Sequence, residues 1–169
     1  MTLAIPRPSL VVLIGPSGAG KSTFARKHFK PTEIVSSDFC RGLVSDDEGD
    51  QSATESAFEL LRFIAAKRLK ASRLTVIDAT SVQPDARRPL LALAREFNVP
   101  AVAIVFHLPE ELCVERSLSR PDRSVPVEVV RKQARDLRES LSDIEREGFR
   151  PIYVLTSSKE IDSSVISTY

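Results

Sequence analysis

Residues Leu10–Thr23 read L-V-V-L-I-G-P-S-G-A-G-K-S-T, an apolar run followed at once by a glycine-rich turn. The turn fits the pattern G-x-x-x-x-G-K-[ST], with Gly15, Gly20, Lys21 and Ser22 at its fixed positions. Consecutive backbone N–H groups in such a loop hold polyphosphate, helped by the positive N-terminal end of the following helix. The stretch therefore predicts a phosphate-binding loop between a buried strand and a helix.

Residues of this loop are expected to hold the phosphates of a nucleotide: Gly15, Ser17, Gly18, Ala19, Gly20, Lys21, Ser22 and Thr23. Lys21 can reach the β- and γ-phosphates, and the hydroxyl of Ser22 can ligate Mg²⁺. The alternative is a glycine-rich turn without a ligand. The apolar run before the loop and the helical pattern after it favour the phosphate-binding interpretation.

Composition limits the classes of protein to consider. The chain has 169 residues, of which 42% are hydrophobic and 28% charged, as expected for one globular domain. Its net charge of +1 excludes a broad, uniformly basic nucleic-acid surface but allows a local basic groove. No apolar stretch approaches the roughly 20 residues of a membrane span. Two cysteines are too few for a disulfide framework, which favours a reducing cytoplasm.

Short runs rich in valine and isoleucine predict buried strands at Ser9–Ile14, Thr32–Val35, Leu74–Ile77, Ala101–Phe106 and Ile152–Leu155. Helical patterns lie between them, at Lys21–Phe29, Thr54–Lys70, Ala86–Phe97, Glu110–Leu118 and Val127–Glu147. Pro89 should sit in the first turn of its helix or kink it, and Gly148 should end the last helix. Leu43–Gln51 is expected to form an acidic loop. This alternation predicts an α/β fold with a parallel sheet covered by helices on both sides.

The segment Ser36–Arg41, S-S-D-F-C-R, follows the second predicted strand. Ligands of open α/β sheets bind outside the carboxyl ends of the strands, so this segment should lie beside the phosphate-binding loop. Asp38 could accept the proton of an attacking hydroxyl or hold Mg²⁺ through water, and Arg41 could present a donor fork to a phosphate. The spacing equally allows Asp38 to be a helix cap and Arg41 a surface charge.

The apolar run Leu74–Ile77 ends in Asp78, where phosphate-binding-loop proteins commonly place an aspartate that organises the metal. Many strands of other proteins also end in aspartate. Beyond it, Thr80 and the pair Arg87 and Arg88 could belong to a substrate-facing loop. For the two arginines a solvated helix face is an equal alternative.

Three arginines follow one another at four- and three-residue steps in E-R-S-L-S-R-P-D-R, namely Arg116, Arg120 and Arg123. On a helix this spacing aligns like charges, whose repulsion a bound anion would relieve. Pro121 favours a hinge there, as expected for a lid that closes over transferring phosphate. An ordinary basic helix end is the alternative; given the phosphate-binding loop, we favour the lid.

Together these segments resemble the 5′-OH polynucleotide kinase module of bacterial polynucleotide kinase–phosphatase RNA-repair enzymes. The resemblance runs through Gly15–Glu48, Thr75–Thr80, Glu115–Arg123 and Glu147–Leu155. It implies a P-loop kinase fold over residues 1–169: a five-stranded, mostly parallel sheet flanked by helices, with a short arginine-bearing lid. The start of the loop, Pro16-Ser17, is the one departure noticed, and it should not block phosphate binding.

The resemblance implies ATP as phosphate donor, Mg²⁺ as cofactor and a 5′-OH end of RNA or DNA as acceptor. Lys21 and Ser22 would engage ATP and Mg²⁺, Asp38 would be the general base, and Arg41 would hold the acceptor or orient Asp38. The donor phosphates would be clamped by Arg116, Arg120 and Arg123, and the metal would be organised by Ser22, Asp38 and Asp78. Phosphatase and adenylyltransferase domains are expected in the full-length protein, which would be cytoplasmic.

Two other functions use the same motifs. A kinase of a small-molecule alcohol needs the same loop, base and lid. A nucleotide-dependent switch would need a guanine-specificity motif of the N-K-x-D type, which the sequence lacks. For a polynucleotide acceptor, Phe39 or Val44 could stack on a base.

Overall fold

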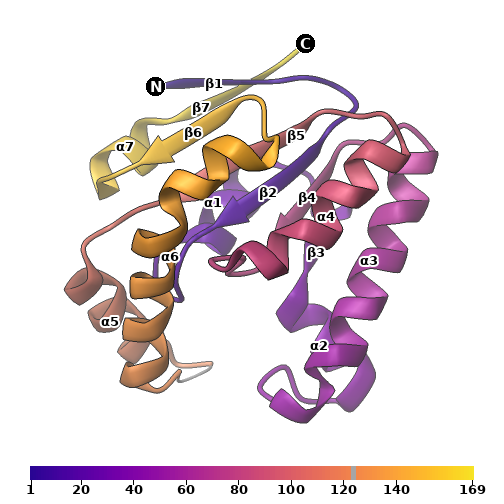
Figure 1. Cartoon of the computed structure of the whole chain (residues 1–169). Coiled ribbons are helices and arrows are strands. Elements are labelled where there is room, and N and C mark those ends of the chain that lie inside the picture. Colours follow the sequence, from indigo (N-terminus) through magenta and orange to yellow (C-terminus); the bar gives the residue numbers. More distant parts are fainter. Residues whose placement is uncertain (123–124) are drawn as a thin grey trace.

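Five parallel strands form the central sheet of the computed structural model, which describes residues 1–122 and 125–169 (Figure 1). Their order across the sheet is β3-β4-β2-β5-β6. They are β2 (Leu10–Ile14), β3 (Ile34–Ser36), β4 (Thr75–Asp78), β5 (Ala101–Phe106) and β6 (Ile152–Leu155). The predicted five-stranded sheet is confirmed, and β2, which leads into the glycine-rich loop, lies at its centre.

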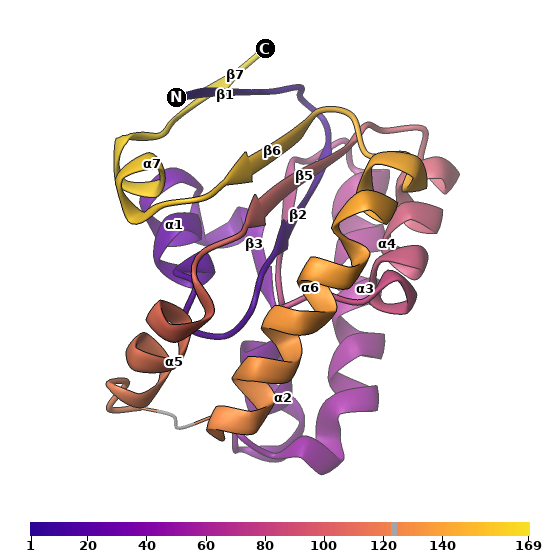
Figure 2. The ribbon, with the colours of Figure 1, turned by 60° about the vertical axis from the view of Figure 1, so that its left-hand side comes forward.

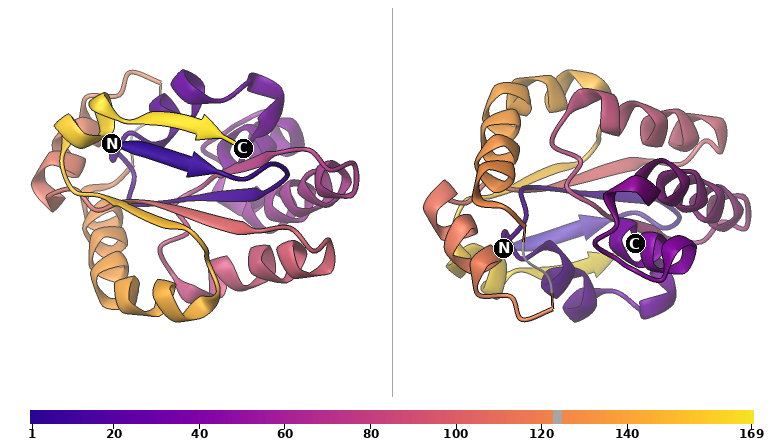
Figure 3. Two further views of the ribbon diagram at one scale, coloured as in Figure 1. Left: turned by 90° about the horizontal axis from the view of Figure 1, so that it is seen from above. Right: turned by 90° about the horizontal axis from the view of Figure 1, so that it is seen from below.

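The core has two layers, one on each face of the sheet, and helices cover both faces (Figure 3). On β2, Leu10, Val12 and Ile14 pack into one layer, whereas Val11 and Leu13 pack into the other. The first layer includes buried side chains of α3 (Thr54–Lys70), α4 (Pro84–Glu96) and α6 (Val127–Glu147). The second includes those of α1 (Lys21–His28) and α7 (Ser158–Ser163). Burial on both faces explains why the strands are continuous apolar runs.

Two further helices lie beyond the carboxyl edge of the sheet, on opposite sides (Figures 1 and 2). One, α2 (Ser37–Ser45), packs on α3; the other, α5 (Glu110–Leu118), packs on α6. Among the residues described, no helix is both long and apolar enough to cross a membrane.

A separate two-stranded parallel sheet brings the chain ends together (Figure 1). It pairs β1 (Thr2–Ile5) with β7 (Val165–Thr168). Leu3 and Ile5 are fully buried, and the hydroxyl of Tyr153 accepts from the backbone N–H of Ala4 at 2.9 Å. Neither strand was predicted. Four-residue strands carry little periodic signal, and β7 is mostly exposed.

The structure corrects two expectations around α2. The strand predicted at Thr32–Val35 begins later, because Pro31–Glu33 form a 3-10 turn. The acidic loop predicted over Leu43–Gln51 is shorter, because α2 continues to Ser45 and a second 3-10 turn begins at Gln51.

The predicted helix Ala86–Phe97 begins earlier, at Pro84, and ends at Glu96. A proline at the first helical position is well tolerated, since its missing N–H would have no partner there. Pro89 lies inside this helix rather than in its first turn.

Arg87 is neither in a substrate-facing loop nor on a solvated face. Its side chain is 0% exposed and donates through Nε and Nη2 to the two carboxylate oxygens of Glu147, each at 2.7 Å. Its Nη1 donates to the carbonyl of Ser81 at 2.9 Å. Arg87 therefore joins α4, α6 and the segment after β4. Only Arg88 is on a solvated face, where it pairs with Asp85.

Candidate active site

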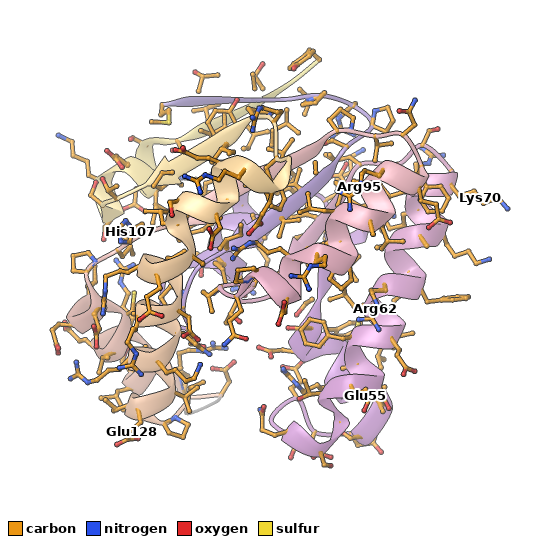
Figure 4. All side chains as sticks on the ribbon, in the orientation of Figure 1. Glu55, Arg62, Lys70, Arg95, His107 and Glu128 are labelled. Atoms are coloured by element: carbon orange, nitrogen blue, oxygen red, sulfur yellow. The ribbon has the colours of Figure 1, made fainter. Side chains whose placement is uncertain are left out.

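The carboxyl ends of three adjacent strands gather the predicted residues. Leu13 of β2 pairs in register with Asp78 of β4, and Asp78 pairs with Ser36 of β3. Neighbouring strands lie about 4.8 Å apart. The phosphate-binding loop, Asp78 and the start of α2 therefore lie side by side. In Figure 4, the labelled Glu55 and Glu128 mark the starts of α3 and α6 on the two sides of this edge.

The phosphate-binding loop is fixed by main-chain packing. The N–H of Gly15 donates to the carbonyl of Thr80 at 2.9 Å, and a Cβ on Gly15 would lie 2.9 Å from the Cβ of Phe106. Gly18 has a φ of +82°, and a Cβ there would overlap the carbonyl oxygen of Cys113 in α5. Both glycines are needed for close approach, because their neighbours are backbone atoms and the Cβ of the buried Phe106.

The loop presents backbone donors at the start of α1. Gly20 precedes the helix with a φ of +91° and, as glycine, offers no side-chain oxygen to cap it. The first N–H groups of the helix can thus receive an anion. Ala19 is fully buried, Ser17 and Ser22 are partly exposed, and Thr23 is exposed. Ser22 is less exposed than Thr23, so its hydroxyl is the better placed of the two to bind a ligand enclosed in the site.

Lys21 lies at the centre of the site. It is 7% exposed, and its Nζ donates to the carbonyl of Pro16 at 2.9 Å. Burial lowers the pKa of Lys21, while the negative charges of Asp78 and Asp38 oppose this shift. Asp38 and Asp78 are therefore close enough to Lys21 to affect its pKa.

Asp38 and Arg41 form a pair on α2. Nη1 of Arg41 lies 2.5 Å from Oδ1 of Asp38, and its Nε donates to Oγ1 of Thr54 at 3.2 Å. The cap of α2 is Ser36, whose Oγ accepts from the N–H of Phe39, so Asp38 lies in the first turn and is not the cap. The side chain of Arg41 is only 9% exposed, so it is not a free surface charge.

Arg116 and Arg120 border the loop from the side of α5. Nη2 of Arg116 donates to Oγ of Ser158 at 2.8 Å, and its Nη1 lies 4.0 Å from the position of a Cβ on Gly20. The side chain of Arg120 is 35% exposed, and its positive charge is close enough to Lys21 to lower the pKa of that lysine. Arg123, predicted as the third arginine of the lid, lies outside the described residues. Two of the three predicted arginines thus lie near the phosphate-binding loop.

Three partners of the site were not predicted. Oε1 of Gln133, on α6, accepts from the N–H of Ser17 at 2.9 Å. The other two are Ser158, which holds Arg116, and Thr54, which holds Arg41. Each is a single polar residue outside any recognisable spacing, and only the folded chain brings it to the site.

The oxygen donors at this edge fit a magnesium ion. Ser22 offers a hydroxyl, and the carboxylate of Asp78 is 8% exposed beside Lys21. In the part of the chain that the structure describes, no group of three or more His, Cys, Asp or Glu could hold a metal by itself. Magnesium is commonly held by one or two protein oxygens together with substrate phosphates, so this sparse set suits it. Asp38 is beside the same lysine but is already paired with Arg41.

Comparisons with known proteins identify a family and a fold. Residues 10–144 match a protein family described as an AAA domain. The chain is 28% identical over 160 residues to Transcription factor bHLH140 of Arabidopsis thaliana, which covers 92% of this chain and 17% of that protein. The chain thus spans less than a fifth of this curated relative.

Among solved structures, a chain of the Pnkp1/Rnl/Hen1 RNA repair complex superposes with a TM-score of 0.70 at 23% identity, covering 82% of this chain and 47% of that one. APS kinase CysC of Mycobacterium tuberculosis, in complex with AMPPNP and APS, superposes with a TM-score of 0.58 at 19% identity, covering 94% and 93%. The fold is that of P-loop kinases, and the predicted resemblance to the RNA-repair kinase module is confirmed at the level of fold.

Proposed function

The chain belongs to the AAA domain family, and from this premise we propose that it is an ATP-dependent polynucleotide 5′-hydroxyl kinase. It transfers the γ-phosphate of ATP to a 5′-OH end of RNA or DNA, in the healing of broken strands. The observation that carries the proposal is the pair of Asp38 and Arg41, whose aspartate lies near enough to the lysine of the phosphate-binding loop to affect the pKa of that lysine.

This pair matches the needs of an acceptor that carries both a hydroxyl and a phosphodiester. The carboxylate of Asp38 can accept the proton of the hydroxyl. The guanidinium of Arg41 is fixed by Asp38 and Thr54 and can offer further N–H donors to a phosphate. A 5′-terminal nucleotide carries these two groups a few bonds apart. A simple alcohol carries only the first.

Exposed apolar side chains on α2 support an acceptor that contains a base. Phe39 is 60% exposed, Leu43 59% and Val44 46%. All three follow Asp38 along α2. Flat nucleobases stack on such side chains, with little dependence on sequence. With a near-neutral chain, binding should then depend only weakly on salt.

In the proposed reaction, the 5′-oxygen forms a bond to the γ-phosphorus while the bond from that phosphorus to the β,γ-bridging oxygen breaks. ADP leaves, and Asp38 takes the proton of the hydroxyl. Lys21 and the loop N–H groups hold the donor phosphates, and Arg116 and Arg120 stabilise the charge on the transferring group. Ser22 and Asp78 would hold Mg²⁺, which neutralises phosphate charge. Catalysis is then mainly positioning and electrostatics.

The wider assignment includes properties of the whole protein. We propose that residues 1–169 work as one kinase domain, in a cytoplasmic protein that also carries phosphatase and adenylyltransferase domains. The partial coverage of the RNA-repair chain, 47%, is compatible with such an arrangement.

The experiment is transfer of labelled γ-phosphate from ATP and Mg²⁺ to 5′-OH oligonucleotides of RNA and DNA. A parallel panel contains a nucleoside, shikimate and APS as small alcohols. We expect labelled oligonucleotide, none with Lys21→Met, and unchanged transfer with Arg88→Ala, an exposed arginine paired with Asp85 in the first turns of α4. Labelling of a small alcohol alone would establish the alternative kinase, and ATP hydrolysis without any labelled acceptor would exclude both.

A further inference from the structure

One peptide unit of the phosphate-binding loop is held at both ends. The carbonyl of Pro16 accepts from Nζ of Lys21 at 2.9 Å. The N–H of the same peptide belongs to Ser17, and it donates to Oε1 of Gln133 at 2.9 Å. The carbonyl and the N–H of a trans peptide point in opposite directions. Lys21 and Gln133 therefore form hydrogen bonds with the Pro16–Ser17 peptide from opposite sides.

The direction of this peptide decides where the lysine ammonium rests. Lys21 is almost fully buried, so its charge needs acceptors within the protein, and Pro16 supplies one. The Pro16–Ser17 peptide can turn about Pro16 ψ and Ser17 φ, and the ring of Pro16, which fixes only φ of Pro16, prevents neither rotation. A hydrogen bond at the N–H is then the direct means of preventing that turn.

Gln133 makes this bond from a helix that is itself anchored. Along α6, Arg131 and Arg138 both bind Glu110 at 3.1 Å, which ties α6 to α5. At the far end of α6, Glu147 binds the fully buried Arg87. The amide of Gln133 is thus presented by a helix held at two places, and it reaches the loop across a sequence separation of 116 residues.

We propose that Gln133 is a positioning residue of the donor site, which holds the Pro16–Ser17 peptide so that its carbonyl keeps the ammonium of Lys21 in place for the nucleotide phosphates. Its consequence for phosphate transfer rests on the proposed function; its consequence for nucleotide binding does not require an acceptor. Gln133 acts through Lys21 and does not itself contact ATP or the acceptor.

The test is a double-mutant cycle on nucleotide affinity, measured by calorimetry with ATP and Mg²⁺ and without acceptor. The variants are Gln133→Met, Lys21→Met and the combination, with Gln133→Ala as a second truncation. Loss of one hydrogen bond should weaken ATP binding roughly two- to tenfold in the chain with Lys21. In the Lys21→Met background, the same change should have no further effect.

The control is Gln83→Met. Gln83 is exposed and also bonds to α6, at Asp136, which is not in the loop. Gln83→Met should leave ATP affinity unchanged. The variants of Gln133 should melt within a few degrees of the parent, since Gln133 is only partly buried.

Two results would overturn the inference. Equal weakening with and without Lys21 would mean that Gln133 does not act through the lysine. Tighter ATP binding in Gln133→Met would mean that Gln133 competes with phosphate for the N–H of Ser17. If the protein binds ATP but labels no 5′-OH end, the proposed function is refuted. The double-mutant cycle on ATP affinity would still test the role of Gln133, because it needs no acceptor.

Discussion

The two halves of the candidate site are built from different parts of the chain. The donor half consists of the phosphate-binding loop (residues 15–22), α1 and α5, and its shape comes from main chain packed on main chain, as at Gly18 against Cys113. The acceptor half consists of α2 and the start of α3, and its chemistry is carried by side chains, Asp38 and Arg41 above all. A backbone cradle leaves no room for variation, whereas side chains on a helix can be exchanged one at a time.

This difference suggests that the donor half determines whether a nucleotide binds and that the acceptor half determines what receives the phosphate.

Asp38→Asn should separate chemistry from donor binding. The amide cannot take the proton of the hydroxyl, so kcat should fall by roughly 10²–10⁴-fold. ATP affinity should stay within about twofold, because Asp38 belongs to the acceptor half. Steady-state transfer to a 5′-OH oligonucleotide and calorimetry with ATP measure the two quantities. Asp85→Asn, at an exposed pair on α4, is the control. An equal loss in ATP affinity would contradict the division.

Gly18→Ala should damage the donor half without touching a side chain. Its φ of +82° disfavours any Cβ, and the added methyl overlaps the carbonyl of Cys113. Strain and overpacking each cost about 1–3 kcal/mol, so ATP affinity should fall by about a hundredfold. The control is Gly148→Ala, at a φ of +114° with no atom within 4 Å of the new Cβ. Gly148→Ala should lower the melting temperature but leave ATP affinity intact. Equal ATP affinities of the two variants would show that the close packing is not needed.

Phe39→Ala should weaken only the acceptor half, and mildly. If the ring stacks on a base, KM for an oligonucleotide should rise about tenfold, with KM for ATP unchanged. Phe63 is a matched control, because it is 61% exposed on α3 with Nζ of Lys67 5.1 Å from its ring centre. Should Phe63→Ala raise the oligonucleotide KM as much as Phe39→Ala, stacking on α2 is not the cause.

A pH-dependent contribution to stability should come from Glu110, at the start of α5 in the donor half. Hydrogen bonds from Arg138 and then Arg131 hold the pKa of Glu110 below its ordinary value of 4.5. A carboxylate with a depressed pKa stabilises the fold above its ordinary pKa, and this contribution is lost as the pH falls through the lowered value. The urea midpoint of the parent should therefore exceed that of Glu110→Gln at pH 7, and the difference should shrink below pH 4.5. A difference independent of pH would exclude the charge of Glu110 as its source.

The sequence allowed the central sheet, most helices and the donor loop to be predicted, because each carries a local pattern. Buried strands such as Ala101–Phe106 are continuous apolar runs, and the phosphate-binding loop has fixed spacing. The helix α2 was missed because its first residues, S-S-D, read equally as a loop, and the cap supplied by Ser36 became visible only in the fold.

The remaining contacts depend on distant parts of the chain. Arg87 lies next to another arginine in sequence, and only the fold reveals that it is buried against Glu147, 60 residues away. Gln133 sits among charged residues on α6, with nothing local to link it to the loop. Polar residues that act singly across such separations have no periodicity to recognise.

The strand register described above also limits how this protein can vary in length. Asp78 pairs with both Leu13 and Ser36, so three strands share one alignment at the edge where the site lies. Deleting a single residue within β4 would turn every following side chain of that strand to the opposite face and carry Asp78 away from Lys21. Insertions and deletions compatible with activity should therefore be confined to the connections at the other edge of the sheet, where the strands begin.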